Sequence, residues 1–482
     1  MLCEAISAQT GFVTTGSDMT ESPTVSAELL NRYGRPGPRY TSYPTAPHFT
    51  ADFGVDEFRR FALAGGAAGR PLSLYIHIPF CSSPCLYCGC NRVITHSAER
   101  AAAYVSRLLR EIELIAPLFH DREVVQLHFG GGTPNFLRPV QLEMLIESLG
   151  QYLRLSTHAQ RDFSIEIDPR FVQPADFPEF ARIGFNRVSF GVQDLDPEVQ
   201  RAVNRVQSEE QTFGAIDACR AAGIDAVNVD LMYGLPRQTL ERFRRTLDAV
   251  IAARPARLAV YGYAHMPQIF KPQRRIRGAD LPDAATRVGL LTAAIEGLSA
   301  AGYRYIGMDH FALADDGLVR AQETGTLHRN FMGYTTHAGC DLLGIGASAI
   351  SHLGESFSQN CRQANDWADA IDEGRLPLWR GLVRNRDDQI RAHVIDRIMC
   401  QGEVSVTEME ERYGIDFWRY FADARQRLAP LEADHLVWVC ASRIMATPSG
   451  RYLLRALASC FDRYLHGTQP VQDAGVMYSK VV

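Results

Sequence analysis

The chain has 482 residues, of which 46% are hydrophobic and 22% charged, and its formal net charge is -5. This is the composition of an ordinary globular protein, and its mild acidity gives no electrostatic reason to expect a nucleic-acid partner. No uninterrupted apolar run reaches the ~18 residues that a membrane-spanning helix needs. Residues 1 to about 25 lack the basic start and apolar segment of a signal peptide, so we expect a loose leader and a cytoplasmic protein.

The predicted elements alternate along most of the chain. Residues 1–53 precede the first strand, and from 54 to 354 short β-branched or aromatic runs alternate with helix-like segments, which indicates a parallel α/β architecture. The strand candidates are 72–79, 124–129, 163–167, 187–192, 226–232 and 257–263, with a further one at 304–309, and the helix-like segments are 100–115, 139–153, 209–222 and 239–252. Six such units predict a partial (β/α)6 barrel. From 355 to 482 we expect a mainly helical C-terminal domain.

Four cysteines, Cys81, Cys85, Cys88 and Cys90, lie directly after the first predicted strand. The first three form the pattern C-x-x-x-C-x-x-C. Structural zinc sites usually use two short Cys pairs separated by roughly a dozen residues or more, and the second pair is absent here. An iron–sulfur cluster is therefore favoured over zinc and over a purely structural role. Three thiolates on a four-iron cluster would leave one iron free to bind a small molecule.

Polar or glycine-rich residues follow the predicted strands at their carboxyl ends. Because the site of a parallel α/β barrel forms at these ends, we expect these residues to converge on one pocket. They are the cysteine loop, Gly130 to Pro134, Glu166 with Asp168, Gln193, Asp230, and Ala264 with His265. The glycines allow a ligand close to the backbone, although a simple tight turn is the alternative. A carboxylate such as Glu166 in an apolar strand favours ligand binding over a structural salt bridge.

Several longer motifs strengthen this interpretation. They are YIHIPFCSSPCLYCGC at 75–90, HFGGGTP at 128–134, SIEIDPR at 164–170, GVQD at 191–194, NVDLMYGLP at 228–236, GMDHFA at 307–312, and HRNF with GYTT within 328–336. Together with RPGPRYTSYPTA at 35–46, they resemble the oxygen-independent coproporphyrinogen III oxidase (dehydrogenase) family of the radical S-adenosylmethionine (SAM) superfamily. The similarity covers nearly the whole chain from Arg35 onward.

This resemblance implies a [4Fe–4S] cluster on Cys81, Cys85 and Cys88, with Cys90 not a ligand. It also implies one SAM molecule on the free iron and a second SAM beside it. Tyr75, Glu166 and Phe331 would be catalytic. The matching positions are Tyr75, Gly131, Glu166 and Ile350 for the first SAM, and Tyr87, Gly132, Thr133, Gln193, Arg205, Asp230 and Ala264 for the second.

The implied activity is the anaerobic oxidative decarboxylation of two propionates of coproporphyrinogen III to vinyl groups through a 5′-deoxyadenosyl radical, giving protoporphyrinogen IX for haem synthesis. Arg35, Arg39 and Arg329 are candidate propionate partners, because Arg binds carboxylates in a bidentate manner. The basic run Lys271, Arg274, Arg275 and Arg277 is a further candidate, although a solvated face is the favoured interpretation there. The sequence does not identify the electron donor or acceptor, and we expect a monomer. Residues 1–53 are expected to cover the substrate opening. A haem-binding chaperone of the same superfamily, which shares the cluster motif, is the alternative.

One residue departs from the family pattern. Where HRNFQGYTT is expected, the chain has Met332 in place of the glutamine. A flexible thioether thus replaces an amide that can both donate and accept hydrogen bonds. We expect position 332 to serve packing and the Met332 protein to be active.

Overall fold

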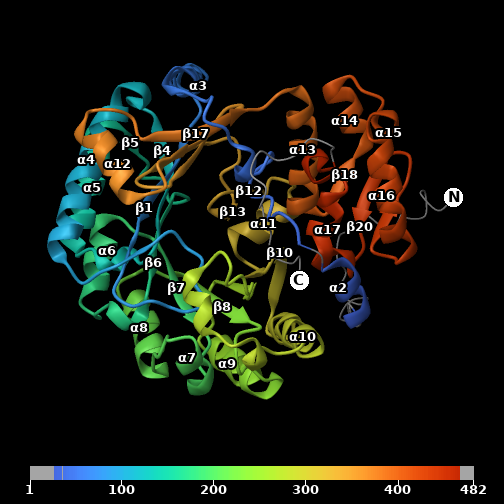
Figure 1. Cartoon of the computed structure of the whole chain (residues 1–482), viewed down its shortest axis with the longest axis horizontal. Helices are drawn as coiled ribbons and strands as arrows, with labels where there is room; N and C mark the ends of the chain where they lie inside the picture. Colours follow the sequence, from blue (N-terminus) through green and yellow to red (C-terminus); the bar gives the residue numbers. More distant parts are fainter. Residues whose placement is uncertain (1–25, 35, 467–482) are drawn as a thin grey trace.

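A large mixed sheet forms the frame of the molecule. The computed structural model describes residues 26–34 and 36–466, so the predicted leader and Arg35 lie outside the described residues. The strand order is β10-β11-β9-β8-β7-β6-β4-β1-β14-β15-β16-β17, with β5 (Arg154–Leu155) beside β4. The sheet is curved, with most of its helices on the outer side (Figure 1).

The central strands of this sheet run parallel from β9 to β14. All six predicted barrel strands are present, within a few residues of the expected bounds. They are β1 (Leu72–Ile78), β4 (Glu123–Gly131), β6 (Asp162–Ile167), β7 (Arg187–Gln193), β8 (Ala226–Tyr233) and β9 (Arg257–Gly262), and β14 (Asp341–Ile345) pairs with β1. The predicted open α/β arrangement is therefore confirmed.

The outer helices connect these strands and cover the convex side. They are α4 (Ala98–Phe119), α5 (Pro139–Tyr152), α6 (Asp176–Ile183), α7 (Pro197–Ala202), α8 (Glu209–Ala221) and α9 (Leu240–Ala252). In β7 and β8 every second residue is buried beneath them, and the residues between are half-buried. Because side chains alternate across a strand, the half-buried set, which includes Asp230, faces the concave side. Polar residues of the strands are thereby directed to the interior of the curve.

Both edges of the sheet are antiparallel. The predicted strand at 304–309 is β10 (Tyr303–Gly307), which joins β9 through β11 (His310–Leu313). At the other edge, β15 (Ile350–Leu353), β16 (Ser356–Asn360) and β17 (Leu378–Val383) follow β14. The sheet therefore continues past residue 354, where we expected strands to stop. The strands β15 and β16 are short and carry polar residues on both faces, so they lack the apolar run that marks a buried parallel strand.

The rest of the C-terminal part is mainly helical. Its helices are α13 (Arg386–Gln401), α14 (Val406–Tyr413), α15 (Phe417–Tyr420), α16 (Ala422–Ala433), α17 (Leu454–Ser459) and α18 (Arg463–His466), beside a small sheet of β18 (Glu403–Ser405), β20 (Arg443–Ala446) and β19 (Val437–Val439). Ile398, Phe417 and Phe421 belong to a core distinct from the one beneath the outer helices. Because the C-terminal part has this core of its own, its helices form a separate group at the right of Figure 1.

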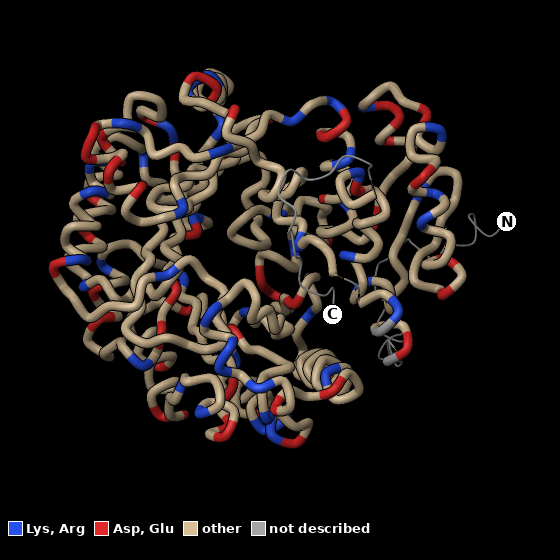
Figure 2. The backbone as a smooth tube through the Cα atoms, viewed as in Figure 1, with Lys and Arg blue, Asp and Glu red and all other residues tan. Residues whose placement is uncertain are grey.

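The remaining elements lie between these two parts or on their rims. They are α2 (Ala27–Tyr33), α3 (Val55–Ala67), β2 (Phe80–Cys81), β3 (Val93–Ile94), α10 (Ala284–Ala300), α11 (Gly317–Glu323), β12 (His328–Asn330), β13 (Gly333–Thr335) and α12 (Ala364–Asp372). Figure 2 shows Lys and Arg positions interspersed with Asp and Glu positions along the outer helices. Within the described ranges, no helix combines the length and the apolar character that crossing a membrane requires.

The N-terminal segment is tied to the C-terminal part. Arg455 donates a hydrogen bond to the carbonyl of Pro38 (3.0 Å), and the Tyr40 hydroxyl donates to Asp462 (3.0 Å). Further along, Thr50 forms a β-bridge with Gly381 of β17. Residues 36–50 therefore connect the small C-terminal core to the edge of the large sheet.

A buried carboxylate joins α4 to the turn after β14. Glu111 is 2% exposed and accepts hydrogen bonds from the Gly346 amide (2.8 Å), Asn360 Nδ2 (2.7 Å) and Trp367 Nε1 (2.9 Å). Burial raises its pKa to about 7, although these three donors act in the opposite direction. Glu111 thus fixes α4, the turn and α12 to one another.

We expect Glu111→Gln to change how stability depends on pH. The pKa of Glu111 is raised from 4.5 to about 7 in the folded protein, so the folded state binds the proton more tightly than the unfolded state. The stability that this proton gives the wild type is fully present below pH 4.5 and is lost as the pH rises to about 7. The stability of the variant minus that of the wild type should therefore increase with pH across this window, by at most about 3 kcal/mol. Urea unfolding between pH 5.5 and 8 measures the difference. Glu113→Gln, at an exposed position of the same helix, should show no such slope.

Candidate functional site

The predicted cluster ligands lie on the loop after β1, at the carboxyl edge of the parallel strands. Cys81 and Cys85 are buried, Cys88 is half-buried and Cys90 is exposed. The Thr133 hydroxyl donates to Cys81 Sγ (3.4 Å). The Cys90 amide donates to Cys88 Sγ (3.4 Å). Each of these two thiols therefore already has a hydrogen-bond donor, the kind of contact that stabilises a thiolate.

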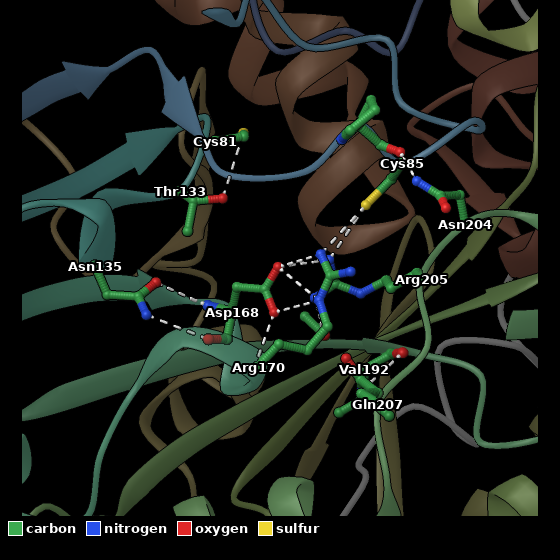
Figure 3. A network of polar contacts seen from close by, with 12 residues as sticks. Cys81, Cys85, Thr133, Asn135, Asp168, Arg170, Val192, Asn204, Arg205 and Gln207 are labelled. Carbon is green, nitrogen blue, oxygen red and sulfur yellow. Dashed lines mark hydrogen bonds and ion pairs between the residues drawn. The ribbon is translucent and has the colours of Figure 1, made fainter. Parts of the chain in front are cut away.

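Cys85 lies against a buried ion-pair network (Figure 3). Arg205 Nη1 is 3.4 Å from Cys85 Sγ and 2.9 Å from Asp168 Oδ2. Arg170 Nη2 is 3.7 Å from the same sulfur and 2.7 Å from Asp168 Oδ2. Burial alone would raise the pKa of Asp168, but the two guanidinium groups hold it below its ordinary value. The network places two cations beside a predicted thiolate ligand while one carboxylate offsets part of their charge.

The donor set fits a cluster better than a single ion. Within the described ranges, no three His, Cys, Asp or Glu side chains converge on a point that could hold one metal ion. A [4Fe–4S] cluster has no such requirement, because each thiolate binds a different iron. The neighbouring turn approaches the cysteine loop closely: a Cβ at Gly132 would lie 2.7 Å from the Phe80 carbonyl oxygen, so only glycine allows the two loops this close. The thiol ligands and the glycine turn are therefore compatible with the predicted cluster.

A second group of predicted residues meets on the inner face of β1, β4 and β6. Glu166 accepts a hydrogen bond from the Gly131 amide (3.2 Å) and lies 3.2 Å from His128 Nε2. The ring of Tyr75 stacks on that of His128, with centroids 6.0 Å apart. The Tyr75 hydroxyl is 3.0 Å from His77 Nδ1. These contacts hold Glu166 in place while 42% of its side-chain surface remains open.

Glu166 shares a cavity of about 140 Å³ with Asp230, which we name the inner cavity. Asp230 accepts hydrogen bonds from Asn228 Nδ2 (2.9 Å) and Ser189 Oγ (3.2 Å). Burial and then the nearby Glu166 raise the pKa of Asp230 to about 7. Two carboxyl groups with different proton affinities thus face one space, which suits the binding of amino and hydroxyl groups.

Other predicted positions lie around these two groups. Gly344 pairs with Tyr75 in the sheet, and a Cβ at Gly344 would lie 2.6 Å from the Ile350 carbonyl oxygen, so Ile350 is beside the first group. Gln193 ends β7 with a left-handed φ of 69°. The carbonyls of Tyr87 and Ala264 accept hydrogen bonds from one side chain, Gln273 Nε2, at 2.8 and 3.2 Å. The cluster loop is thereby fastened to the segment after β9.

The predicted substrate residues lie at the open side of the sheet. Arg39 is 3.4 Å from Asp309, and its guanidinium lies 5.7 Å from the Tyr261 ring, which lines the inner cavity. Phe331 follows β12 and packs edge-on against Phe357 (6.0 Å between centroids). Arg329 lines a different, larger cavity. Among the described residues, no hydrogen bond, ion pair or ring contact joins Phe331 or Arg329 to Glu166. The structure therefore brings the predicted SAM positions together more closely than the predicted substrate positions.

Met332 lines the inner cavity with Glu166 and Asp230. Its amide donates to Asn330 Oδ1 (2.8 Å), which shapes the turn between β12 and β13. The side chain is half-buried and is not part of a hydrophobic core cluster. This position beside the inner cavity does not test the expectation that Met332 serves packing, which stays a prediction until the substitution described below is measured. A residue on a short turn can face a polar space that its sequence neighbours do not reveal.

Several functional neighbours were not predicted from the sequence. Arg170, His128 and Gln273 each contact a predicted residue directly. Arg170 and His128 lie within the quoted motifs SIEIDPR and HFGGGTP, so a signal existed for them. Gln273 lies in the basic run Lys271 to Arg277, for which the sequence favours a solvated face over a propionate contact and predicts no contact with the cysteine loop. Its role depends on the fold of the segment after β9.

Comparison with known proteins supports the resemblance found in the sequence. Residues 75–250 match the radical SAM superfamily model, and residues 385–453 match the HemN C-terminal domain model. The chain is 49% identical to the oxygen-independent coproporphyrinogen III oxidase of Pseudomonas aeruginosa, over 91% of this chain and 96% of the relative. It is 43% identical to the Escherichia coli protein of that name, over 94% of this chain and 98% of the relative.

A solved structure agrees with these matches. Coproporphyrinogen III oxidase (HemN) from Escherichia coli, described as a radical SAM enzyme, is 42% identical, with a TM-score of 0.87, over 92% of this chain and 100% of that chain. The fold class predicted from the sequence is thus confirmed. The chain belongs to the oxygen-independent coproporphyrinogen III oxidase family of the radical SAM superfamily.

Proposed function

We propose that this chain converts two propionate side chains of coproporphyrinogen III to vinyl groups in the absence of oxygen, giving protoporphyrinogen IX. The observation that carries the proposal is the cysteine loop at the edge of the inner face on which Glu166 and Asp230 share a cavity. Relatives with names for this activity match more than nine-tenths of the chain. Those names do not favour the haem-binding chaperone.

The family implies a [4Fe–4S] cluster and SAM, and we assign their ligands to this chain. Cys81, Cys85 and Cys88 would hold three irons. A reduced cluster bound there would supply the electron for cleaving SAM to methionine and a 5′-deoxyadenosyl radical, the species that would take a hydrogen atom from the propionate. The propionate then loses CO₂ and one electron, so the reaction needs an external one-electron donor and an electron acceptor.

The role of the protein is to position these reactants. Glu166, fixed by His128 and the Gly131 amide, would grip the first SAM together with Tyr75 and Ile350. For the second SAM we propose Asp230 with the remaining predicted positions: Tyr87, Gly132, Thr133, Gln193, Arg205 and Ala264. Arg205 also balances the charge at Cys85. Phe331, Arg39 and Arg329 would form the substrate side of the opening.

We further propose that the described residues 36–53 cover this opening, that 54–354 form the radical SAM barrel and that 355–466 belong to the C-terminal domain; residues 1–25, 35 and 467–482 of the predicted parts lie outside the described residues. The contacts of residues 36–50 with β17 and the C-terminal core support the cover. Because β16 and β17 belong to the large sheet, the strands of the barrel part continue to Val383. The domain boundary therefore needs a test of its own, such as limited proteolysis.

The test of function is an anaerobic assay of reconstituted protein with coproporphyrinogen III, SAM and a chemical reductant. We expect vinyl products, CO₂, methionine and 5′-deoxyadenosine. Haem titration of the same preparation tests the alternative function, because a haem-binding chaperone should bind haem stoichiometrically. Stoichiometric haem binding with an intact cluster but no vinyl product would contradict the proposal.

Met332→Gln should raise turnover. Because Met332 faces the inner cavity with Glu166 and Asp230, an amide there can form a hydrogen bond that the thioether cannot form well. One such bond is worth about 1 kcal/mol, so kcat/KM should increase roughly fivefold. Met332→Leu, which keeps an apolar side chain, should leave turnover within about twofold. Equal rates for the Gln variant and the wild type would show that the cavity does not use this position.

A further inference from the structure

A second cavity of about 410 Å³, which we name the outer cavity, lies outside the positions assigned to SAM. The N-terminal segment, β12, β15 to β17, α13 and α14 meet around it. Its polar wall includes Ser42, His328, Arg329, Glu355, Arg384 and Asp396. A cavity of this size is at the small end of ligand pockets, which suits one arm of a ligand more than a whole tetrapyrrole.

The outer cavity contains a buried arginine without a counter-ion. Arg329 is 8% exposed, and within the described ranges its Nε and Nη1 have no hydrogen-bond partner and its guanidinium forms no ion pair. Its flat face lies over the Tyr334 ring, 4.7 Å from the centroid. A buried unpaired charge costs several kcal/mol, so a protein normally supplies a partner or leaves the group to meet a ligand.

The two carboxylates of the wall do not compensate Arg329. Glu355 pairs with Arg384 (2.8 Å), and Asp396 pairs with His328 (3.5 Å). The Ser42 hydroxyl, from the N-terminal segment, also has no hydrogen-bond partner among the described residues. The outer cavity therefore offers an uncompensated positive charge and a free hydroxyl, which together suit a carboxylate.

The β12–β13 hairpin connects the outer cavity with the inner one. Arg329 lines the outer cavity, and Met332, three residues later, lines the inner cavity with Glu166 and Asp230. Three residues of extended chain span at most about 10 Å. A single ligand with several carboxylate arms can therefore reach both cavities.

We propose that the outer cavity binds a propionate carboxylate that is retained in the product, held by Arg329 and Ser42. This inference rests on the proposed function, in which only two of the four propionates of coproporphyrinogen III react. A retained carboxylate fixed here orients the macrocycle while another propionate enters the reaction site. The N-terminal segment supplies Ser42, so the subsite is complete only when residues 40–43 are in place.

The test compares Arg329→Gln, Arg329→Lys and Ser42→Ala with the wild type in the reconstituted holoprotein. Coproporphyrin III and its tetramethyl ester are the binding probes, measured anaerobically by porphyrin fluorescence. We expect Arg329→Gln to weaken the binding of coproporphyrin III at least tenfold. The affinity for the tetramethyl ester should stay within twofold of the wild-type value. The affinity of Arg329→Lys for coproporphyrin III should lie between those of the wild type and Arg329→Gln, because lysine keeps the positive charge but cannot donate two parallel hydrogen bonds to one carboxylate. Arg304→Gln, at an exposed position of β10 outside both cavities, should not change either affinity.

Turnover assays give a second measure. The Arg329→Gln variant should show a KM for coproporphyrinogen III raised about tenfold and should release more product with only one vinyl group. Iron content and circular dichroism identify any variant that fails to fold. If Arg329→Gln does not fold, the binding data of Arg329→Lys and Ser42→Ala test the subsite instead. If Arg329→Gln weakens the binding of coproporphyrin III and of its ester equally, or weakens neither, the proposed carboxylate subsite is wrong. A wild type that binds coproporphyrin but forms no vinyl product would instead overturn the proposed function.

Discussion

Replacing Cys81, Cys85 or Cys88 with alanine should leave the protein without its iron–sulfur cluster. Anaerobically reconstituted wild type should hold about four irons per chain and absorb broadly near ~400 nm, as thiolate-bound clusters do. Each single substitution should remove nearly all of this iron, because a cluster with only two protein thiolates is exposed to solvent and exchange. Iron and sulfide analysis, with the absorption spectrum, measures the outcome.

Cys90→Ala is the matched control for this loop. The contact of Cys90 with Cys88 Sγ includes its backbone amide (3.4 Å), which alanine retains. We therefore expect Cys90→Ala to keep the cluster. If it loses iron as completely as the other three variants, the three-ligand assignment is wrong.

Asp168→Ala should have the second large effect. The substitution leaves Arg170 and Arg205 buried beside Cys85 without their carboxylate. Removing one partner of a buried ion pair typically costs about 3 to 5 kcal/mol. We expect a clear decrease in the urea midpoint and a lower yield of reconstituted cluster.

Asp372→Ala serves as the comparison for Asp168→Ala. Asp372 pairs with Arg107 at 2.6 Å, but the two side chains are 52% and 33% exposed. Exposed pairs contribute about 0 to 1 kcal/mol, so this variant should unfold almost like the wild type. Similar midpoints for the two variants would show that the buried network does not stabilise the loop.

The parallel strands were predictable because burial on the outer face gives each of them a dense apolar pattern. The antiparallel strands β15 and β16 were not, since polar residues on both of their faces conceal the alternation. The residues of the candidate site divide in the same way into those with a signal in the local sequence and those without one. Glu166 was proposed because a carboxylate in an apolar strand is costly without a function, and Asp230 because polar residues at the carboxyl ends of parallel strands converge on one site. Gln273 was not, because its contacts with the carbonyls of Tyr87 and Ala264 come from a loop whose course local sequence does not determine.

The sequence by itself determined the family and the positions of the barrel strands along the chain, and it predicted the cluster ligands. These depend on local spacing and on the periodicity of apolar residues, which are properties of neighbouring residues in the chain. Only the tertiary structure decided that Met332 lines the same cavity as Glu166 and Asp230, and that Arg329 lies buried in an outer cavity without a counter-ion among the described residues. Both results depend on which distant segments approach the β12–β13 hairpin. Solvation and charge balance at a residue are set by neighbours in space, and the chain brings those neighbours from positions as far apart as Ser42 and Asp396.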